Sequence, residues 1–197
     1  MRLLVFSDIH GDAGALERLM EIEADHYIAA GDLCTFARGL DAMCAILARR
    51  AGKVWVLPGN HESAPQIEAA CAAHGLNPLH ERSFEAGGYQ VAGLGYSNPT
   101  PFNTPGEYSE AEIASKLEMF DGLEPLVLIC HCPPLGTALD EAAPGRHLGS
   151  ASVAAFVERV QPRYFVSGHI HEAAGRKTML GRTEGYSAGK HGVLIEL

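Results

Sequence analysis

Side chains that can bind metal ions follow five separate apolar runs in this sequence of 197 residues. The apolar runs are typical of β-strands, and in an open α/β sheet the ligand site lies just beyond the carboxyl ends of the strands. Five such ends can therefore converge on one place. Carboxylate, imidazole and amide groups gathered there suit two divalent cations, so the pattern predicts a two-metal hydrolase. The residues concerned are Asp8 and His10, Asp32, Asn60 and His61, His131, and His169 and His171.

Each of these residues also has a simpler interpretation when it is taken alone. The D-x-H and H-x-H pairs project to one side of an extended chain, but such pairs also occur by chance. An isolated Asp32 would more often cap a helix, and an isolated Asn60 would more often lie in a turn. The convergence of five clusters at strand ends outweighs these separate interpretations.

The elements that must position these residues alternate over the first half of the chain. Each apolar run is followed by a segment with helical periodicity, and such βαβ units predict a parallel sheet with right-handed crossovers. The expected strands are 2–7, 26–30 and 53–57, and the expected helices are 13–22, 37–50 and 64–74.

The second half of the chain does not continue this regular alternation of strand and helix. Gly87-Gly88 between two short apolar segments indicates a hairpin, and Ser109 with Glu112 indicates a capped helix start. Two loops rich in proline or glycine, 96–108 and 132–148, are expected to frame the site as a substrate rim. The other expected elements are strands 82–86, 89–94, 125–130 and 163–167, helices 109–119 and 149–160, and two or three short strands after them.

Composition limits the class of protein. The length suits a single domain over 1–197, and a net charge of −9 disfavours a nucleic-acid partner, which would need a basic face. No apolar stretch reaches membrane-spanning length, so no membrane partner is expected. The five cysteines are scattered and the sequence opens with a strand, which predicts a cytoplasmic protein with reduced thiols. Nothing in the sequence indicates the oligomeric state.

Five motifs that span Asp8 to His171 resemble the calcineurin-like metallophosphoesterase superfamily. In order along the chain they are D-x-H, G-D, G-N-H-E, H and G-H-x-H. The resemblance implies an α/β fold, a four-layer α-β-β-α sandwich of two mixed sheets. It also implies two metal sites that share Asp32 as a bridge. One site would consist of Asp8, His10, Asp32 and His171, and the other of Asp32, Asn60, His131 and His169.

The resemblance assigns His61 as the general acid that protonates the leaving group, which suits an imidazole because it titrates near neutral pH. The alternative is a histidine that only orients the substrate phosphate. The protein-phosphatase branch has an acid and then an arginine after the G-D motif, where this sequence has Thr35 and Phe36. This departure counts against phosphoprotein phosphatase activity.

Later segments look like the small Icc-related predicted phosphoesterases of bacteria and archaea. The similar segments are 98–105, 131–134, 147–150 and 168–172, whereas 187–190 departs from the usual closing segment of that group. Arg146 and His147 are candidate phosphate-binding residues, although a solvated loop arginine is an equal alternative. Cys130 and Cys132 flank His131 and could suggest zinc, but packing in the core is the stronger interpretation.

These observations predict a dinuclear metal-dependent phosphoesterase, with phosphodiesterase favoured over phosphomonoesterase activity, acting on a small molecule or nucleotide. A metal-bridging hydroxide would attack phosphorus, and His61 would protonate the leaving group. Among the metals, Mn²⁺ is favoured, and Fe, Zn²⁺ and Ni²⁺ are alternatives. A nuclease of the same superfamily and a non-catalytic scaffold of the same fold are the competing functions.

Overall fold

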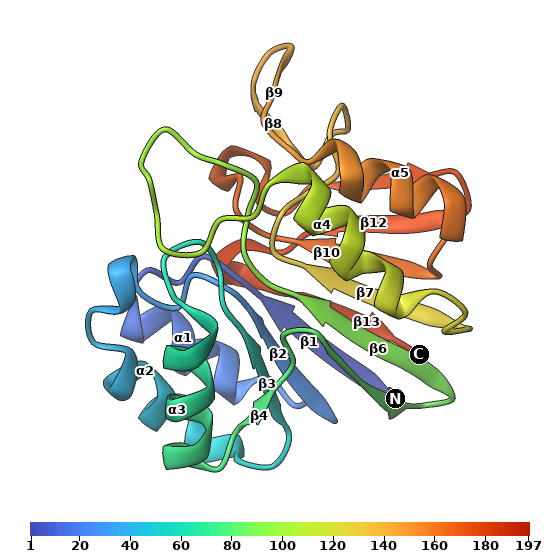
Figure 1. Cartoon of the computed structure of the whole chain (residues 1–197). Helices are drawn as coiled ribbons and strands as arrows, with labels where there is room; N and C mark the ends of the chain where they lie inside the picture. The colour runs from blue at the N-terminus through green and yellow to red at the C-terminus, as the bar shows by residue number, and fades with distance from the viewer.

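A computed structural model describes residues 1–197 and contains two large mixed β-sheets (Figure 1). In the first sheet the strand order is β13-β1-β2-β3-β4. The first four strands in the chain run parallel to one another, and β13 pairs antiparallel to β1. The strands of this sheet are β1 (Arg2–Phe6), β2 (His26–Ala30), β3 (Val54–Leu57), β4 (Asn77–Pro78) and β13 (Val193–Glu196).

The second sheet has the order β11-β12-β10-β7-β6-β5. Its central pairs are parallel, and antiparallel hairpins β5–β6 and β11–β12 close its two edges. The strands are β5 (Arg82–Ala86), β6 (Tyr89–Leu94), β7 (Leu126–Cys130), β10 (Tyr164–Ser167), β11 (Lys177–Leu180) and β12 (Thr183–Ser187).

Helices cover the outer face of each sheet. In Figure 1, α1, α2 and α3 lie beside the first sheet, and α4 and α5 lie over the second. The helices are α1 (Ala13–Glu21), α2 (Leu40–Leu47), α3 (Ala64–His74), α4 (Glu110–Leu117) and α5 (Ala151–Val160). None of them combines the length and the apolar character that crossing a bilayer requires.

Side chains that point alternately to the two faces of each strand explain how the helix and sheet layers pack. On β1, Leu3 and Val5 face the second sheet and share a core with Val127 of β7. Leu4 and Phe6 point the other way and pack against the helices of the first sheet. A third core lies between the second sheet and helices α4 and α5. Three apolar layers therefore separate helix, sheet, sheet and helix, which confirms the predicted four-layer sandwich of two mixed sheets.

Three local expectations differ from the structure. The helix expected over 37–50 is interrupted, because Gly39 adopts a left-handed conformation between a 3-10 turn, η1 (Thr35–Ala37), and α2. The expected loop 132–148 contains a small hairpin of β8 (Glu141–Ala143) and β9 (Arg146–His147), which projects from the body of the molecule (Figure 1). The third difference is the two-residue strand β4, which was not expected because it has no apolar run.

Candidate metal centre

The carboxyl ends of β1, β2 and β3 in one sheet lie next to those of β7 and β10 in the other. Backbone hydrogen bonds join neighbouring loops within each sheet, from Asp8 N to Gly31 O at 3.1 Å and from Gly168 N to His131 O at 3.1 Å. The imidazole Nδ1 of His131 crosses between the sheets and lies 2.8 Å from the carbonyl oxygen of Ala30. The five clusters of metal-binding residues therefore meet at one end of the sandwich.

Asp32 lies at the middle of this cluster and is almost completely buried. Its Oδ2 atom is 3.7 Å from Nε2 of His10 and 3.5 Å from Nε2 of His131. Its Oδ1 atom accepts a hydrogen bond from the backbone N–H of His61 at 3.0 Å. One carboxylate oxygen is thus available on both sides, toward two different groups of ligands.

The first group consists of Asp8, His10 and His171. The Nε2 atoms of His10 and His171 are 3.0 Å apart, and Nε2 of His171 is 3.7 Å from Oδ1 of Asp8. Potential ligand atoms of all three residues lie within 4.8 Å of one another. Two imidazole nitrogens and a carboxylate oxygen that converge in this way suit a single divalent cation.

The second group consists of His131, His169 and Asn60, again with Asp32. The amide Oδ1 of Asn60 is 3.2 Å from Nε2 of His131 and 3.0 Å from Nδ1 of His169. Ligand atoms of Asp32, His131 and His169 lie within 4.8 Å of one another. The structure therefore brings all seven candidate ligands into two groups that share Asp32.

Hydrogen bonds on the outer side of the ligands set their orientation. When Nδ1 of His131 donates to the carbonyl of Ala30, the lone pair of Nε2 remains free for a metal ion. Nδ1 of His10 lies 3.1 Å from Oγ1 of Thr35, and Nδ2 of Asn60 donates to Oγ1 of Thr104 at 3.2 Å. Each contact directs the remaining donor atom inward, so the residues fit a pair of cations.

Burial and charge shift the pKa values of these groups in the metal-free protein. Burial lowers the pKa of His169 to about 3, so this imidazole is neutral and can serve as a ligand. Burial also acts on His131, but the adjacent carboxylate of Asp32 outweighs it and raises the pKa of His131 to about 9. Binding of a cation at Nε2 of His131 must therefore displace a proton.

Glu62, the last residue of the G-N-H-E motif, was given no role from the sequence, yet it supports the site. It is fully buried, and Oε2 accepts hydrogen bonds from the backbone N–H groups of Asp32 at 3.1 Å and Gly59 at 3.0 Å. Oε1 accepts from the N–H of Cys34 at 2.8 Å. Burial and the nearby Asp32 raise the pKa of Glu62 to about 7. The signal that could have identified it is an acid directly after the catalytic candidate His61.

Backbone strain is concentrated at the same place. Four candidate ligands that are not glycine have positive φ angles: Asp8 at 56°, His10 at 48°, Asp32 at 54° and His169 at 69°. Such conformations cost roughly 1–3 kcal/mol each and persist at functional sites. The neighbouring Gly31 has φ of 95°, and a β-carbon there would lie 2.5 Å from Nδ1 of His131. Packing around the cluster therefore requires glycine before Asp32.

His61 lies beside the first group of ligands, and potential ligand atoms of His61, His10 and Asp32 lie within 4.8 Å of one another. Its ring is 5.2 Å from that of His10 and 4.9 Å from that of Phe36, with edge-to-face geometry in both cases. Its Nδ1 atom is buried and has no hydrogen-bond partner in the protein. A buried polar atom without a partner is costly, so this atom is ready for a partner that the chain does not supply.

The other candidates lie apart from the cluster. Arg146 is exposed on the projecting hairpin, and Nδ1 of His147 pairs with buried Asp140 at 2.7 Å. No hydrogen bond or ion pair joins either residue to the metal-binding groups. Cys130 and Cys132 are buried in the core between the second sheet and its helices, and burial raises the pKa of Cys132 to about 12.

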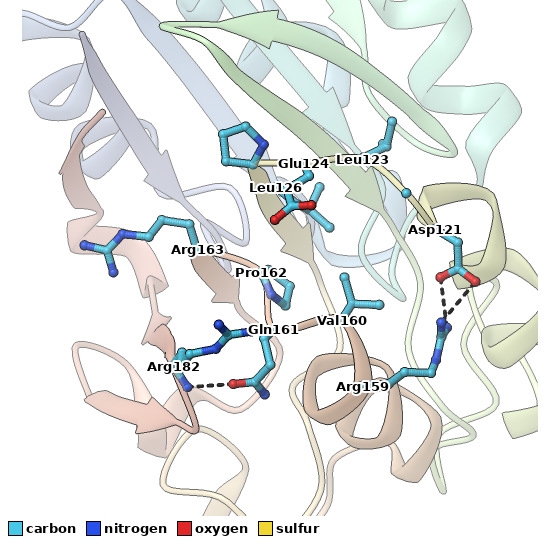
Figure 2. Close-up of a pocket in the computed structure, with 12 residues that line it drawn as sticks. Asp121, Leu123, Glu124, Leu126, Arg159, Val160, Gln161, Pro162, Arg163 and Arg182 are labelled. Carbon is cyan, nitrogen blue, oxygen red and sulfur yellow. Dashed lines mark hydrogen bonds and ion pairs between the residues drawn. The ribbon is translucent and has the colours of Figure 1, made fainter.

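A surface pocket of the molecule lies away from this cluster. Figure 2 shows it near Leu126 and Arg163, at the starts of β7 and β10. Its volume is about 660 Å³. The metal-binding residues follow the opposite ends of these strands. In this pocket Arg159 is paired with Asp121 at 2.9 Å, and Arg163 is paired with Glu184 outside the lining at 2.9 Å. The chemistry is therefore assigned to the buried cluster and not to the pocket.

Comparison with known proteins agrees with the metal-binding cluster that the structure contains. A family model described as calcineurin-like phosphoesterase matches residues 1–173. The uncharacterized protein MJ1162 of Methanocaldococcus jannaschii is 31% identical over 180 residues, covering 88% of this chain and 81% of the relative.

Two solved structures show the same fold at low identity. The crystal structure of TT1561 from Thermus thermophilus has a TM-score of 0.74 and 21% identity, covering 95% of this chain and 88% of that one. The phosphopantetheinyl hydrolase PptH from Mycobacterium tuberculosis has a TM-score of 0.69 and 17% identity, with the same coverage of 95% and 88%.

The sequence match, the fold and the convergent ligands agree with one another. The family is one of metal-dependent phosphoester hydrolases, and the structure contains His and Asp groups that can hold divalent cations. The family resemblance noted in the sequence is confirmed by a match over most of the chain. The protein belongs to the calcineurin-like phosphoesterase family.

Proposed function

We propose that the protein is a dinuclear metal-dependent phosphodiesterase that acts on a small molecule or nucleotide. The observation that carries the proposal is the position of Asp32, whose Oδ2 lies within 3.7 Å of His10 in one group of ligands and 3.5 Å of His131 in the other. A carboxylate that serves both groups is what a two-metal centre needs. A pair of bound cations lowers the pKa of a water molecule and neutralises charge on a phosphoryl group.

In this proposal the ligands divide into two sets. The first cation is held by Asp8, His10, Asp32 and His171. The second is held by Asp32, Asn60, His131 and His169. The mixture of nitrogen and oxygen donors favours Mn²⁺, with Fe, Zn²⁺ and Ni²⁺ as alternatives.

His61 acts as the general acid. An alkoxide is a poor leaving group unless it receives a proton, and an imidazole can supply that proton near neutral pH. The ring lies against His10 at 5.2 Å, and its Nδ1 has no protein partner. Thus His61 is adjacent to the first metal site and not engaged elsewhere in the chain.

The preference for diesters rests on the residues after the G-D motif. A monoester dianion needs more positive charge than a diester monoanion. Here Thr35 is neutral, and its Oγ1 lies 3.1 Å from Nδ1 of His10. Phe36 packs against His61. Neither side chain can bind a phosphate oxygen as an arginine does.

The remaining parts of the proposal concern partners and location. The substrate is a small phosphoester, and the net charge of −9 disfavours the alternative of a nuclease. Arg146 and His147 remain candidate phosphate contacts from the rim loop 132–148. The retained ligands and His61 disfavour a scaffold without activity. The proposed location is the cytoplasm, on the basis of the unpaired, buried cysteines.

The deciding experiment compares two chromogenic substrates on protein reconstituted with Mn²⁺. Bis-p-nitrophenyl phosphate should be hydrolysed faster than p-nitrophenyl phosphate, and metal-free protein and Asp32→Asn should hydrolyse neither. Faster hydrolysis of the monoester would contradict the diesterase assignment. A panel of cyclic nucleotides, dinucleotides, phospholipid headgroups and a phosphopantetheinyl conjugate would then narrow the substrate.

A further inference from the structure

The side chain of Phe36 is exposed at the edge of the candidate metal centre. It is 47% accessible to solvent, although phenylalanine is normally buried. One edge contact is made with the imidazole of His61, at 4.9 Å between ring centroids and an interplanar angle of 83°. The rest of the ring has no part in the three hydrophobic cores. Packing therefore does not account for an aromatic side chain here.

The backbone at this position is also unfavourable for a residue with a β-carbon. Phe36 has φ of 50° and ψ of 41°, and the next residue, Ala37, has φ of 54°. Glycine would adopt these angles without strain, whereas an L side chain does so rarely. Both the exposure and the conformation of Phe36 oppose stability, and strain of this kind is typical of functional positions.

We infer that Phe36 is a specificity-determining residue that contacts the leaving group of the substrate, and that this leaving group is apolar or aromatic next to the ester oxygen. The inference rests on the proposed function, in which His61 protonates the leaving oxygen. The atoms bonded to that oxygen then lie beside the imidazole of His61, which Phe36 also contacts. The exposed part of the Phe36 ring is an apolar surface for those atoms, and it offers no hydrogen bond to a polyhydroxylated alcohol such as glycerol.

A diester with two different alcohols tests the inference by internal competition. Hydrolysis of benzyl methyl phosphate forms one new P–O bond from water and breaks one ester P–O bond. As that bond breaks, His61 passes a proton to the departing oxygen, and the proton lost by the attacking water replaces it. Cleavage on one side gives benzyl alcohol and methyl phosphate, and cleavage on the other gives methanol and benzyl phosphate. The ratio of the two alcohols at low conversion reports which group occupies the leaving position, independently of enzyme concentration and metal loading.

The wild-type protein should release mainly benzyl alcohol. Phe36→Gly should shift the ratio toward methanol by about five- to tenfold, which is the effect of removing one apolar ring contact. Phe36→Tyr retains the ring and should keep the wild-type ratio. Met119→Ala is the matched control, because Met119 is 48% exposed on the 3-10 turn after α4 and should leave the ratio unchanged.

Thermal unfolding separates this role from a structural one. Because glycine relieves the positive φ angle, Phe36→Gly should unfold at the same temperature as the wild type or higher, while its product ratio changes. An unchanged ratio in Phe36→Gly overturns the inference, and so does a wild type that cleaves bis-p-nitrophenyl phosphate but releases no benzyl alcohol. If the wild type cleaves neither diester, the proposed function itself fails.

Discussion

The Oδ2 atom of Asp32 and the Nε2 atom of His10 lie 3.7 Å apart, although the two residues follow different strands of the first sheet. The same oxygen is 3.5 Å from Nε2 of His131, which follows a strand of the second sheet. Asp32 therefore joins candidate ligands from both halves of the sandwich, and the two proposed metal sites are expected to depend on it together.

Replacing Asp32 should empty both sites, whereas replacing His10 should mainly empty one. Asp32→Asn removes the only charge that both groups share, and His10→Ala removes a single imidazole. Elemental analysis after dialysis should find close to no metal in the first variant and about one ion per chain in the second. Two ions per chain with full activity in Asp32→Asn would falsify the assignment.

His61→Asn should leave the metal content intact and reduce kcat by roughly 10²- to 10⁴-fold on substrates with poor leaving groups. The loss should be smaller for p-nitrophenolate, because this group departs without a proton. The measurement is a series of diesters with leaving groups of increasing pKa. An equal loss across the series would assign His61 to orienting the phosphate and not to proton transfer.

Glu62→Gln should weaken the support of the ligand loops. The carboxylate accepts three backbone hydrogen bonds, and an amide N–H₂ group would oppose at least one of those donors. At pH 8, where the carboxylate is ionised, the free energy of unfolding in urea should fall by about 1–3 kcal/mol. Glu68→Gln is the matched control, since the Glu68–Arg82 pair is exposed and contributes little. Equal stability of the two variants would contradict the prediction.

The metal-free protein should lose stability between about pH 6.5 and pH 4, and His80 should contribute to this loss alongside the buried His169. Burial lowers the pKa of His80 to about 4 from 6.5, and Nδ1 accepts a hydrogen bond from the N–H of Gly95 at 2.9 Å. The neutral form is therefore favoured in the folded state. Stability is fully present above pH 6.5 and declines as the pH falls toward 4, by up to about 3 kcal/mol.

His80→Gln tests this assignment, because glutamine keeps an acceptor near Gly95 but does not titrate. Urea denaturation from pH 7 to pH 4.5 should show a flatter stability profile for the variant than for the wild type. Parallel profiles would mean that another group is responsible for the acid sensitivity.

The sequence was sufficient to predict the layers of the fold and the convergence of the candidate ligands. Apolar runs that stop at Asp8, Asp32 or His131 are visible without a structure, since strand ends and ligands are adjacent in the chain. The late start of helix α2 at Leu40 was not visible, because its cause is the left-handed conformation of Gly39, and glycine within a helical pattern does not reveal its φ angle.

The supporting contacts could not be predicted because their partners are distant in the sequence. Thr104 lies 44 residues after Asn60, and only the folded loop brings its hydroxyl to the amide. The exposure of Phe36 could not be predicted either, because it depends on the backbone conformation of the turn η1. Sequence reasoning noticed that this position lacks an arginine, but it could not show that the ring packs against His61.

The contact between Ser7 and Gly189 has a consequence for the order in which the site is assembled. Ser7 donates from its N–H to the Gly189 carbonyl at 3.0 Å and from its hydroxyl to Oδ2 of Asp8 at 2.6 Å, and that hydroxyl also accepts from the N–H of Gly189. This contact spans 182 positions, so on the ribosome every candidate ligand emerges before Gly189 does. Asp8 therefore reaches its final orientation only after the nascent chain has extended past Gly189, and early capture of a metal ion would precede the completed geometry.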